Sequence, residues 1–193
     1  NFDFASCGYA LCIVDTGGSH SDLTDEYAAV RKEMESVAAY LGKSVLREVD
    51  ESEFVKNIAD IRSSCGDRAV LRAMHFYGDN ARVEKQAAAL RAGDFKTFMK
   101  YIIESGRSSY MYNQNVYSCK KAAEQPVSLA LSLSEKLLDG CGAWRVHGGG
   151  FAGTIQAFVP LNKLDEYKDL MERVFGSGSC YVLSVRPVGG VEL

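Results

Sequence analysis

The pattern of apolar and polar positions predicts one strand near the start of the chain and helices after it. Gly8 to Asp15 (GYALCIVD) is short, apolar and rich in strand-forming residues, and a glycine turn, Thr16-Gly17-Gly18, follows it. This is typical of a buried strand that ends in a turn. A helix is predicted next, with Thr24 as its N-cap and Gly42 as its stop. One face of this helix is apolar and carries Tyr27, Val30, Met34, Val37 and Leu41.

The middle of the chain is predicted to be mainly helical. The helices are expected at Glu51 to Ile61, where the pattern is weaker, at Asp67 to Arg91, from the N-cap Asp94 to near Gly106, and from Pro126 to Leu138. The polar, tyrosine-rich stretch SSYMYNQNVYS lies between the last two and has no clear period. It is predicted to be a loop, where ligand contacts tend to occur.

The last fifty residues return to strand patterns. Short strands are predicted at Ala143 to His147, Thr154 to Val159 and Cys180 to Val185, with a helix at Asn162 to Phe175. Together with the first strand, this order predicts an α+β fold: a small, mostly antiparallel sheet with helices packed on one face. We expect residues 1–193 to form a single domain.

Composition narrows the classes of function. The chain has 193 residues, of which 47% are hydrophobic and 24% charged, and a formal net charge of −3. No basic cluster favours nucleic acid, and no apolar window is long enough to cross a membrane, so neither partner is expected and the predicted location is cytoplasmic. The six cysteines form no CxxC pair and the three histidines lie far apart, so neither a disulfide framework nor a metal site is predicted.

The candidate chemistry centres on WRVHGGGFAGTIQAFVP, Trp144 to Pro160, where glycines interrupt a strand pattern. Such glycines indicate either a sharp turn or the close approach of another group to the backbone. The run is not a P-loop, because no Lys-Ser/Thr pair follows it, and not a dinucleotide fingerprint, because a strand follows it. His147 adjoins the glycines and is a candidate ligand contact, although a surface histidine at a strand end is the commoner case. Tyr27 could present its hydroxyl to a sugar-sized ligand, or could simply be a tyrosine at the core edge.

Three stretches taken together resemble the galactokinases of the GHMP kinase superfamily. VHGGGFAG resembles the third glycine-rich signature of that superfamily, with Gly148, Gly149, Gly150, Phe151 and Gly153 matching. DEYAAVRKE is similar to the galactokinase glutamate-tyrosine-x-x-arginine-arginine helix, and DNARVEKQAAALRAGD is similar to a later helix and turn. Four positions depart from the family pattern: Val30, His147, Ala152 and Thr154. Gly106 also stands where the family has histidine, and the segment from Gly106 to Ser118 diverges.

The resemblance implies a fold like the C-terminal domain of GHMP kinases, an elaborated ferredoxin-like arrangement. It implies that the complete protein transfers the γ-phosphoryl group of ATP, with Mg²⁺, to the anomeric hydroxyl of galactose. By the same resemblance, the hydroxyl of Tyr27 contacts the sugar and the loop from Gly148 to Gly153 forms the floor of the cleft. The N-terminal catalytic and ATP-binding domain of the family has no counterpart here, so no catalytic residue is assigned in this chain. The chain alone is expected to be inactive.

Other functions are compatible with the same residues. One is a non-catalytic sugar-binding sensor or regulator of the same superfamily, and another is a kinase for a different sugar or small alcohol. A third is an unrelated α+β interaction module in which the glycines only make a turn. A half-enzyme would also expose a face that a partner domain normally covers, so self-association is a further expectation.

Overall fold

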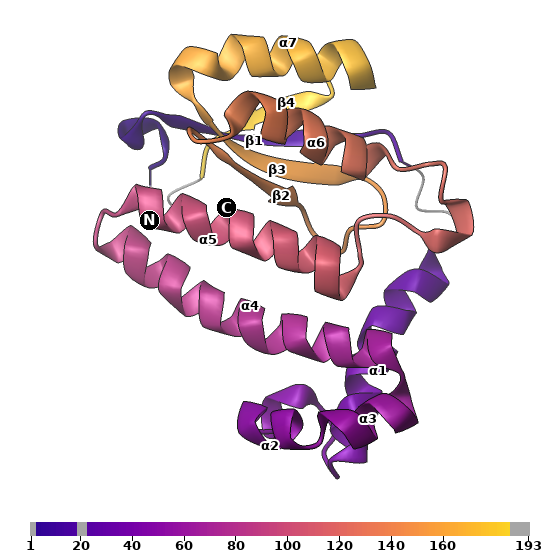
Figure 1. Cartoon of the computed structure of the whole chain (residues 1–193). Coiled ribbons are helices and arrows are strands. Elements are labelled where there is room, and N and C mark those ends of the chain that lie inside the picture. The colour runs from indigo at the N-terminus through magenta and orange to yellow at the C-terminus, as the bar shows by residue number, and fades with distance from the viewer. Residues whose placement is uncertain (1–2, 19–22, 186–193) are drawn as a thin grey trace, which may run out of the picture.

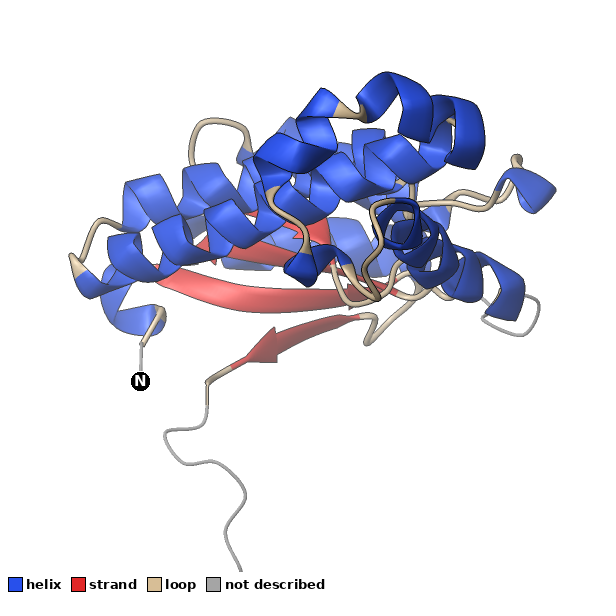
Figure 2. Cartoon of the chain, turned by 90° about the horizontal axis from the view of Figure 1, so that it is seen from below, coloured by secondary structure: helices blue, strands red, loops and turns tan. Residues whose placement is uncertain are grey.

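The computed structural model describes residues 3–18 and 23–185, which form a four-stranded sheet and seven α-helices (Figure 1). The sheet is antiparallel with the strand order β2-β3-β1-β4, so β1 lies between β3 and β4. The turned view in Figure 2 shows β4 at the margin of the sheet. The strands are β1 (Tyr9–Asp15), β2 (Ala143–Val146), β3 (Thr154–Pro160) and β4 (Cys180–Leu183).

The helices begin and end close to the residues that were predicted to cap or stop them. Asp94 caps α5, because its carboxylate accepts a hydrogen bond from Thr97 N at 3.0 Å, and Pro126 opens α6. The helix predicted at Glu51 to Ile61 is divided in two at Asn57. The helices are α1 (Thr24–Tyr40), α2 (Glu51–Lys56), α3 (Ile58–Cys65), α4 (Asp67–Arg91), α5 (Phe95–Ser108), α6 (Pro126–Leu138) and α7 (Leu164–Phe175).

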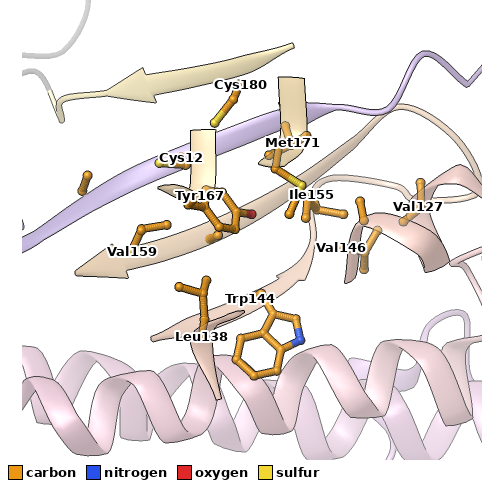
Figure 3. Packing of buried hydrophobic residues seen from close by; sticks show 14 of the residues in the cluster. Cys12, Val127, Leu138, Trp144, Val146, Ile155, Val159, Tyr167, Met171 and Cys180 are labelled. Atoms are coloured by element: carbon orange, nitrogen blue, oxygen red, sulfur yellow. The ribbon is translucent and has the colours of Figure 1, made fainter. Parts of the chain in front are cut away.

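The α+β class and the small antiparallel sheet are confirmed, but the helices cover both faces of the sheet rather than the single face predicted. Cys12 of β1 lies in the main core with Leu138 of α6 and Tyr167 and Met171 of α7 (Figure 3), and Val14 of β1 belongs to the same cluster. On the opposite face, Phe98 of α5 packs against Phe158 of β3 and forms a second cluster. Because β1 and β3 carry apolar residues on both faces, each face needs a cover.

Helices α1 to α4 build a third core away from the sheet. Val37 of α1, Phe54 of α2 and Ile61 of α3 are buried against Ala73 of α4. Figure 1 shows α4 running beside α5, so this helical core is joined to the sheet through α5. Among the described residues, no helix has the length and apolar character that crossing a membrane would require.

A buried polar network joins α4, α5 and β2. Asp79 accepts hydrogen bonds from Arg82 Nε at 3.0 Å and from the Ser105 hydroxyl at 2.6 Å. Ser105 in turn accepts from Arg145 Nη1 at 2.7 Å. His75 lies at the other side of Asp79 and shares a 2.9 Å hydrogen bond with the Ser108 hydroxyl. Since Arg145 is the third residue of β2, the network fixes the strand that leads into the glycine run.

His75 makes the stability of the chain depend on pH. Burial, with help from the positive charges of Arg82 and Arg145, holds the pKa of His75 below its ordinary value of 6.5, against the opposing effect of Asp79. Both folded and unfolded chains carry neutral His75 above that pH. Below it, the unfolded chain binds a proton that the folded chain does not. The free energy of unfolding should therefore fall as the pH drops from about 7 to about 5.

The matched variant for this prediction is His75→Gln, which can still hydrogen-bond Ser108. Urea unfolding at a series of pH values should give a shallower dependence for this variant than for the wild type between about pH 7 and pH 5. Parallel curves for the two proteins would show that His75 does not titrate differently in the folded chain.

Candidate functional site

Three segments far apart in the sequence meet beside the sheet. They are the first turn of α1, the turn at residues 113–118 that follows α5, and the connection 147–153 between β2 and β3. A π-helical turn, η3 (Ser109–Asn113), extends α5 and brings Asn113 and Asn115 under the glycine run. The predicted tyrosine-rich loop is thus partly helical, and its polar end forms part of the site.

The glycines are explained by the close approach of this chain's own side chains and backbone. A Cβ on Gly149 would lie 2.7 Å from Cε1 of Tyr27, and a Cβ on Gly150 would lie 1.8 Å from the carbonyl oxygen of Asn115. Neither position can hold a side chain without movement of its neighbour. Gly148, in contrast, has nothing within 4 Å, and its φ of +69° makes it a turn glycine. Both predicted interpretations therefore apply, each at a different glycine.

Tyr27 is locked against the glycine run. Its hydroxyl donates a 2.7 Å hydrogen bond to the carbonyl oxygen of Gly150, and its ring meets the ring of Phe151 edge-on at 5.3 Å. Burial raises the pKa of the Tyr27 phenol above 10, so the side chain is neutral at physiological pH. A neutral phenol both donates and accepts hydrogen bonds, which suits it to contact a hydroxylated ligand.

Asn115 holds the glycine run from the other side. Its amide nitrogen donates to the carbonyl oxygen of Gly149 at 3.0 Å, and its own carbonyl oxygen accepts from Phe151 N at 2.5 Å. Phe151 adopts a left-handed backbone conformation with φ of +59°, which costs a non-glycine residue about 1–2 kcal/mol. The buried Phe151 ring packs with Leu23 and Ala152 and offsets that cost.

Charged residues of α1 and α4 hold the start of the turn at residues 113–118. Arg72 of α4 is fully buried, and its Nε donates to the carbonyl oxygen of Asn113 at 3.0 Å while its Nη1 pairs with Glu33 at 2.9 Å. Glu33 also pairs with Arg68 on the solvent side at 2.5 Å. Burial lowers the pKa of Arg72, and the carboxylate of Glu33 opposes that effect. The Arg72 side chain thus links α1, α4 and the turn at Asn113.

A second polar contact fixes the start of α1 next to Tyr27. The carboxylate of Glu26 is nine-tenths buried and accepts a 2.6 Å hydrogen bond from the Ser118 hydroxyl. Acidic residues are favoured in the first turn of a helix because they face its positive end. The bond joins α1 to the end of the turn that carries Asn115.

Two cavities adjoin the glycine run. One has a volume of about 620 Å³ and is lined by Tyr27, Gly148, Gly149 and Asn115, with Phe76 and Met34 on its apolar side. The other measures about 650 Å³ and lies beyond Phe151, next to the end of β1 and the start of α6. A cavity with one apolar wall, an amide and a phenol has the character of a site for a small polar ligand with an apolar face.

The structure brings together most of the predicted site residues. Tyr27, Gly149, Gly150 and Phe151 are in mutual contact, and Gly153 accepts hydrogen bonds at its carbonyl oxygen from Thr16 at the end of β1. His147 is exposed, lies 3.4 Å from the Thr154 hydroxyl, and lines neither cavity. Its role in ligand contact stays a prediction. Within residues 3–18 and 23–185, no group of three or more histidine, cysteine or acidic side chains could hold a metal ion.

The sequence interpretation missed Asn115, Arg72 and the pair formed by Glu26 and Ser118. Arg72 lies between the apolar residues Val70 and Met74 of α4, and the apolar spacing of that helix does not reveal that its charge is buried. The polar composition of residues 113–118 was the one available signal for Asn115.

No family model matches the chain, but comparison with individual proteins is informative. The chain is 35% identical to a galactokinase of Bos taurus over 90% of the chain's length, and 31% identical to a galactokinase of Homo sapiens over 91% of that length. A galactokinase of Actinobacillus pleuropneumoniae is 25% identical over 85% of the chain. The chain spans only 41–42% of the length of these relatives.

The fold agrees with this relationship. The crystal structure of Lactococcus lactis galactokinase complexed with galactose superposes with a TM-score of 0.68, covering 92% of this chain and 45% of that one, at 22% identity. By sequence and by fold, the chain is therefore a relative of the galactokinases that matches about two fifths of their length.

Proposed function

We propose that this chain is the C-terminal domain of a galactokinase-like sugar kinase. The complete protein would transfer the γ-phosphoryl group of ATP to the anomeric hydroxyl of galactose in the cytoplasm, and residues 1–193 alone would be inactive. The observation that carries the proposal is the contact of Tyr27 with Gly149 and Gly150 beside a cavity of about 620 Å³. These are the residues on which the galactokinase resemblance rests, and they meet in space.

In this proposal the chain forms one wall of the sugar site. The backbone of Gly149 and Gly150 places the Tyr27 ring, and the 2.7 Å bond to Gly150 sets the direction of its hydroxyl proton. The phenol oxygen then serves as acceptor for a sugar hydroxyl, and the ring offers a flat surface to the apolar face of the sugar. A sugar fixed in this way needs less loss of motion on reaching the transition state, which is how positioning residues contribute to phosphoryl transfer.

In the proposal, the Mg²⁺ that neutralises phosphate charge and most of the ATP contacts belong to a domain outside this chain. Self-association of the isolated chain through the face which that domain would cover also remains a prediction.

The experiment for the sugar contact is Tyr27→Phe in the complete kinase. The variant keeps the ring against Phe151 but removes the hydroxyl. We expect KM for galactose to rise about tenfold, the effect of one lost hydrogen bond of about 1.4 kcal/mol, with a smaller change in KM for ATP. Coupled detection of ADP release gives both constants.

The control for this experiment is Tyr40→Phe, at the end of α1, where the side chain is 44% exposed. It should leave both KM values unchanged. Equal KM for galactose in wild type and Tyr27→Phe would remove the sugar contact from the proposal and return Tyr27 to a packing role.

A further inference from the structure

Asn115 holds two successive peptide units of the glycine run. Glycine restricts the backbone less than any other residue, so residues 148–150 need contacts from elsewhere to keep one conformation. The Asn115 Nδ2 donates to the carbonyl oxygen of Gly149 at 3.0 Å, and the Asn115 carbonyl oxygen accepts from Phe151 N at 2.5 Å. The run is therefore fixed on both sides of Gly150.

The orientation of Asn115 is itself determined by the fold. The residue is only 4% exposed, and its amide nitrogen must be the atom that faces Gly149, because a carbonyl oxygen can only accept a hydrogen bond. The preceding Gln114 has a left-handed conformation with φ of +53°, and its N–H donates to the carbonyl oxygen of Ser109 at 2.8 Å. The π-helical turn η3 thus presents Asn115 to the glycine run in one orientation.

These contacts determine the direction of the Tyr27 hydroxyl. In a planar trans peptide the N–H and the carbonyl point in opposite directions, so the unit that joins Gly150 to Phe151 directs its N–H to Asn115 and its carbonyl to Tyr27. The Gly150 carbonyl oxygen accepts from the Tyr27 hydroxyl at 2.7 Å and from Ala152 N at 2.7 Å, which uses both of its lone pairs. The hydroxyl proton of Tyr27 is committed to Gly150, and the phenol oxygen is left as an acceptor.

We infer that Asn115 is a positioning residue for the sugar: it fixes the peptide units around Gly150 and so keeps the Tyr27 oxygen turned to accept a hydrogen bond from the substrate. The inference rests on the proposed function, which assigns Tyr27 to the sugar. Asn115 acts through Tyr27 and not through a bond of its own to the substrate. Its contribution is pre-organisation, because a hydroxyl that is already in place loses less motion when the sugar binds.

A double-mutant cycle in the complete kinase separates this role from a general loss of structure. Asn115→Ala removes the amide donor to Gly149 and should raise KM for galactose about threefold, with KM for ATP unchanged. Asn115→Asp keeps the size of the side chain but replaces the donor by an acceptor, and it should have the same effect. In the Tyr27→Phe background, where KM for galactose is already about tenfold higher, Asn115→Ala should cause no further increase.

The matched control is Asn57→Ala, between α2 and α3. The Asn57 amide also donates to a backbone carbonyl oxygen, that of Glu53 at 2.8 Å, but far from Tyr27 in the fold, so both KM values should stay at the wild-type level. Urea unfolding shows whether each variant is folded under the assay conditions.

Two results would overturn the inference while the proposed function stands. One is a wild-type KM for galactose in both Asn115 variants. The other is a rise of about thirtyfold in the double variant, the product of two independent effects, which would mean that Asn115 does not act through the Tyr27 hydroxyl. A folded wild-type protein without turnover on galactose would be a different outcome, since it would remove the proposed function and this inference together.

Discussion

Replacing Gly150 by alanine is expected to destabilise the chain by about 3 kcal/mol or more. The added Cβ would lie 1.8 Å from the carbonyl oxygen of Asn115, in a backbone conformation with φ of +81° that alanine adopts at a cost. Left-handed strain accounts for about 1–2 kcal/mol, and displacement of the Asn115 turn adds an overpacking cost of about 1–3 kcal/mol. Urea unfolding followed by circular dichroism measures the loss.

Gly148→Ala is the matched control for this change. Gly148 has a similar φ of +69° but no atom within 4 Å of the added Cβ, so only the left-handed strain of about 1–2 kcal/mol should appear. The difference between the two variants isolates the contact with Asn115. If both variants lose the same stability, the close packing of Gly150 on the turn is not what requires a glycine there.

Arg72→Met is expected to cost about 3–5 kcal/mol, the range measured when one partner of a buried ion pair is removed. Methionine fills a similar volume but leaves the carbonyl oxygen of Asn113 without its donor and Glu33 with Arg68 alone. Because Asn113 begins the turn that carries Asn115, the ordering of the glycine run should weaken along with global stability. Amide hydrogen exchange at Gly149 to Phe151 should become faster than in the wild type.

The comparison for this prediction is Arg62→Met, which breaks an exposed ion pair with Asp67. Exposed pairs contribute little to stability, so its unfolding curve should overlay that of the wild type. An Arg72→Met protein as stable as Arg62→Met would show that the buried guanidinium does not hold the turn.

Local signals predicted the regular elements well. The limits Asp67 and Arg91 of α4 and the cap at Asp94 follow directly from glycine, aspartate and apolar spacing, and the structure reproduces them. Thr24 was wrong as an N-cap: it is the first residue of α1, and Leu23 occupies the cap position without a side-chain bond. Propensity cannot resolve such a shift of one residue, because a threonine suits either position.

Long-range packing was the part that local patterns could not give. Met74 and Val83 are apolar residues of α4 that spacing alone would favour as buried, but both are exposed, while Arg72 and His75 are buried by contacts with α5 and the turn at Asn113. The placement of helices on both faces of the sheet also depends on which apolar strand residues find partners. Neither fact is encoded in the spacing within one helix.

The sequence indicated most residues of the candidate site, but it did not show why glycines are required at positions 149 and 150. The glycine run and Tyr27 were candidates from the sequence, and the structure places them in contact with each other, which the sequence did not predict. Asn115 was missed because it approaches Gly150 through its backbone oxygen, an interaction that requires the left-handed Gln114 before it. A turn of this kind is set by tertiary contacts and has no distinct sequence pattern.

ATP-dependent phosphorylation of a panel of sugars, measured on residues 1–193 and on the complete protein, decides whether the proposed function holds. Phosphorus NMR of the product distinguishes an anomeric phosphate from phosphate at any other hydroxyl. We expect the complete protein to phosphorylate galactose at the anomeric position, and we expect no turnover by the chain alone. A well-folded complete protein that binds galactose without phosphorylating it, or that acts only on another acceptor, would contradict the assignment.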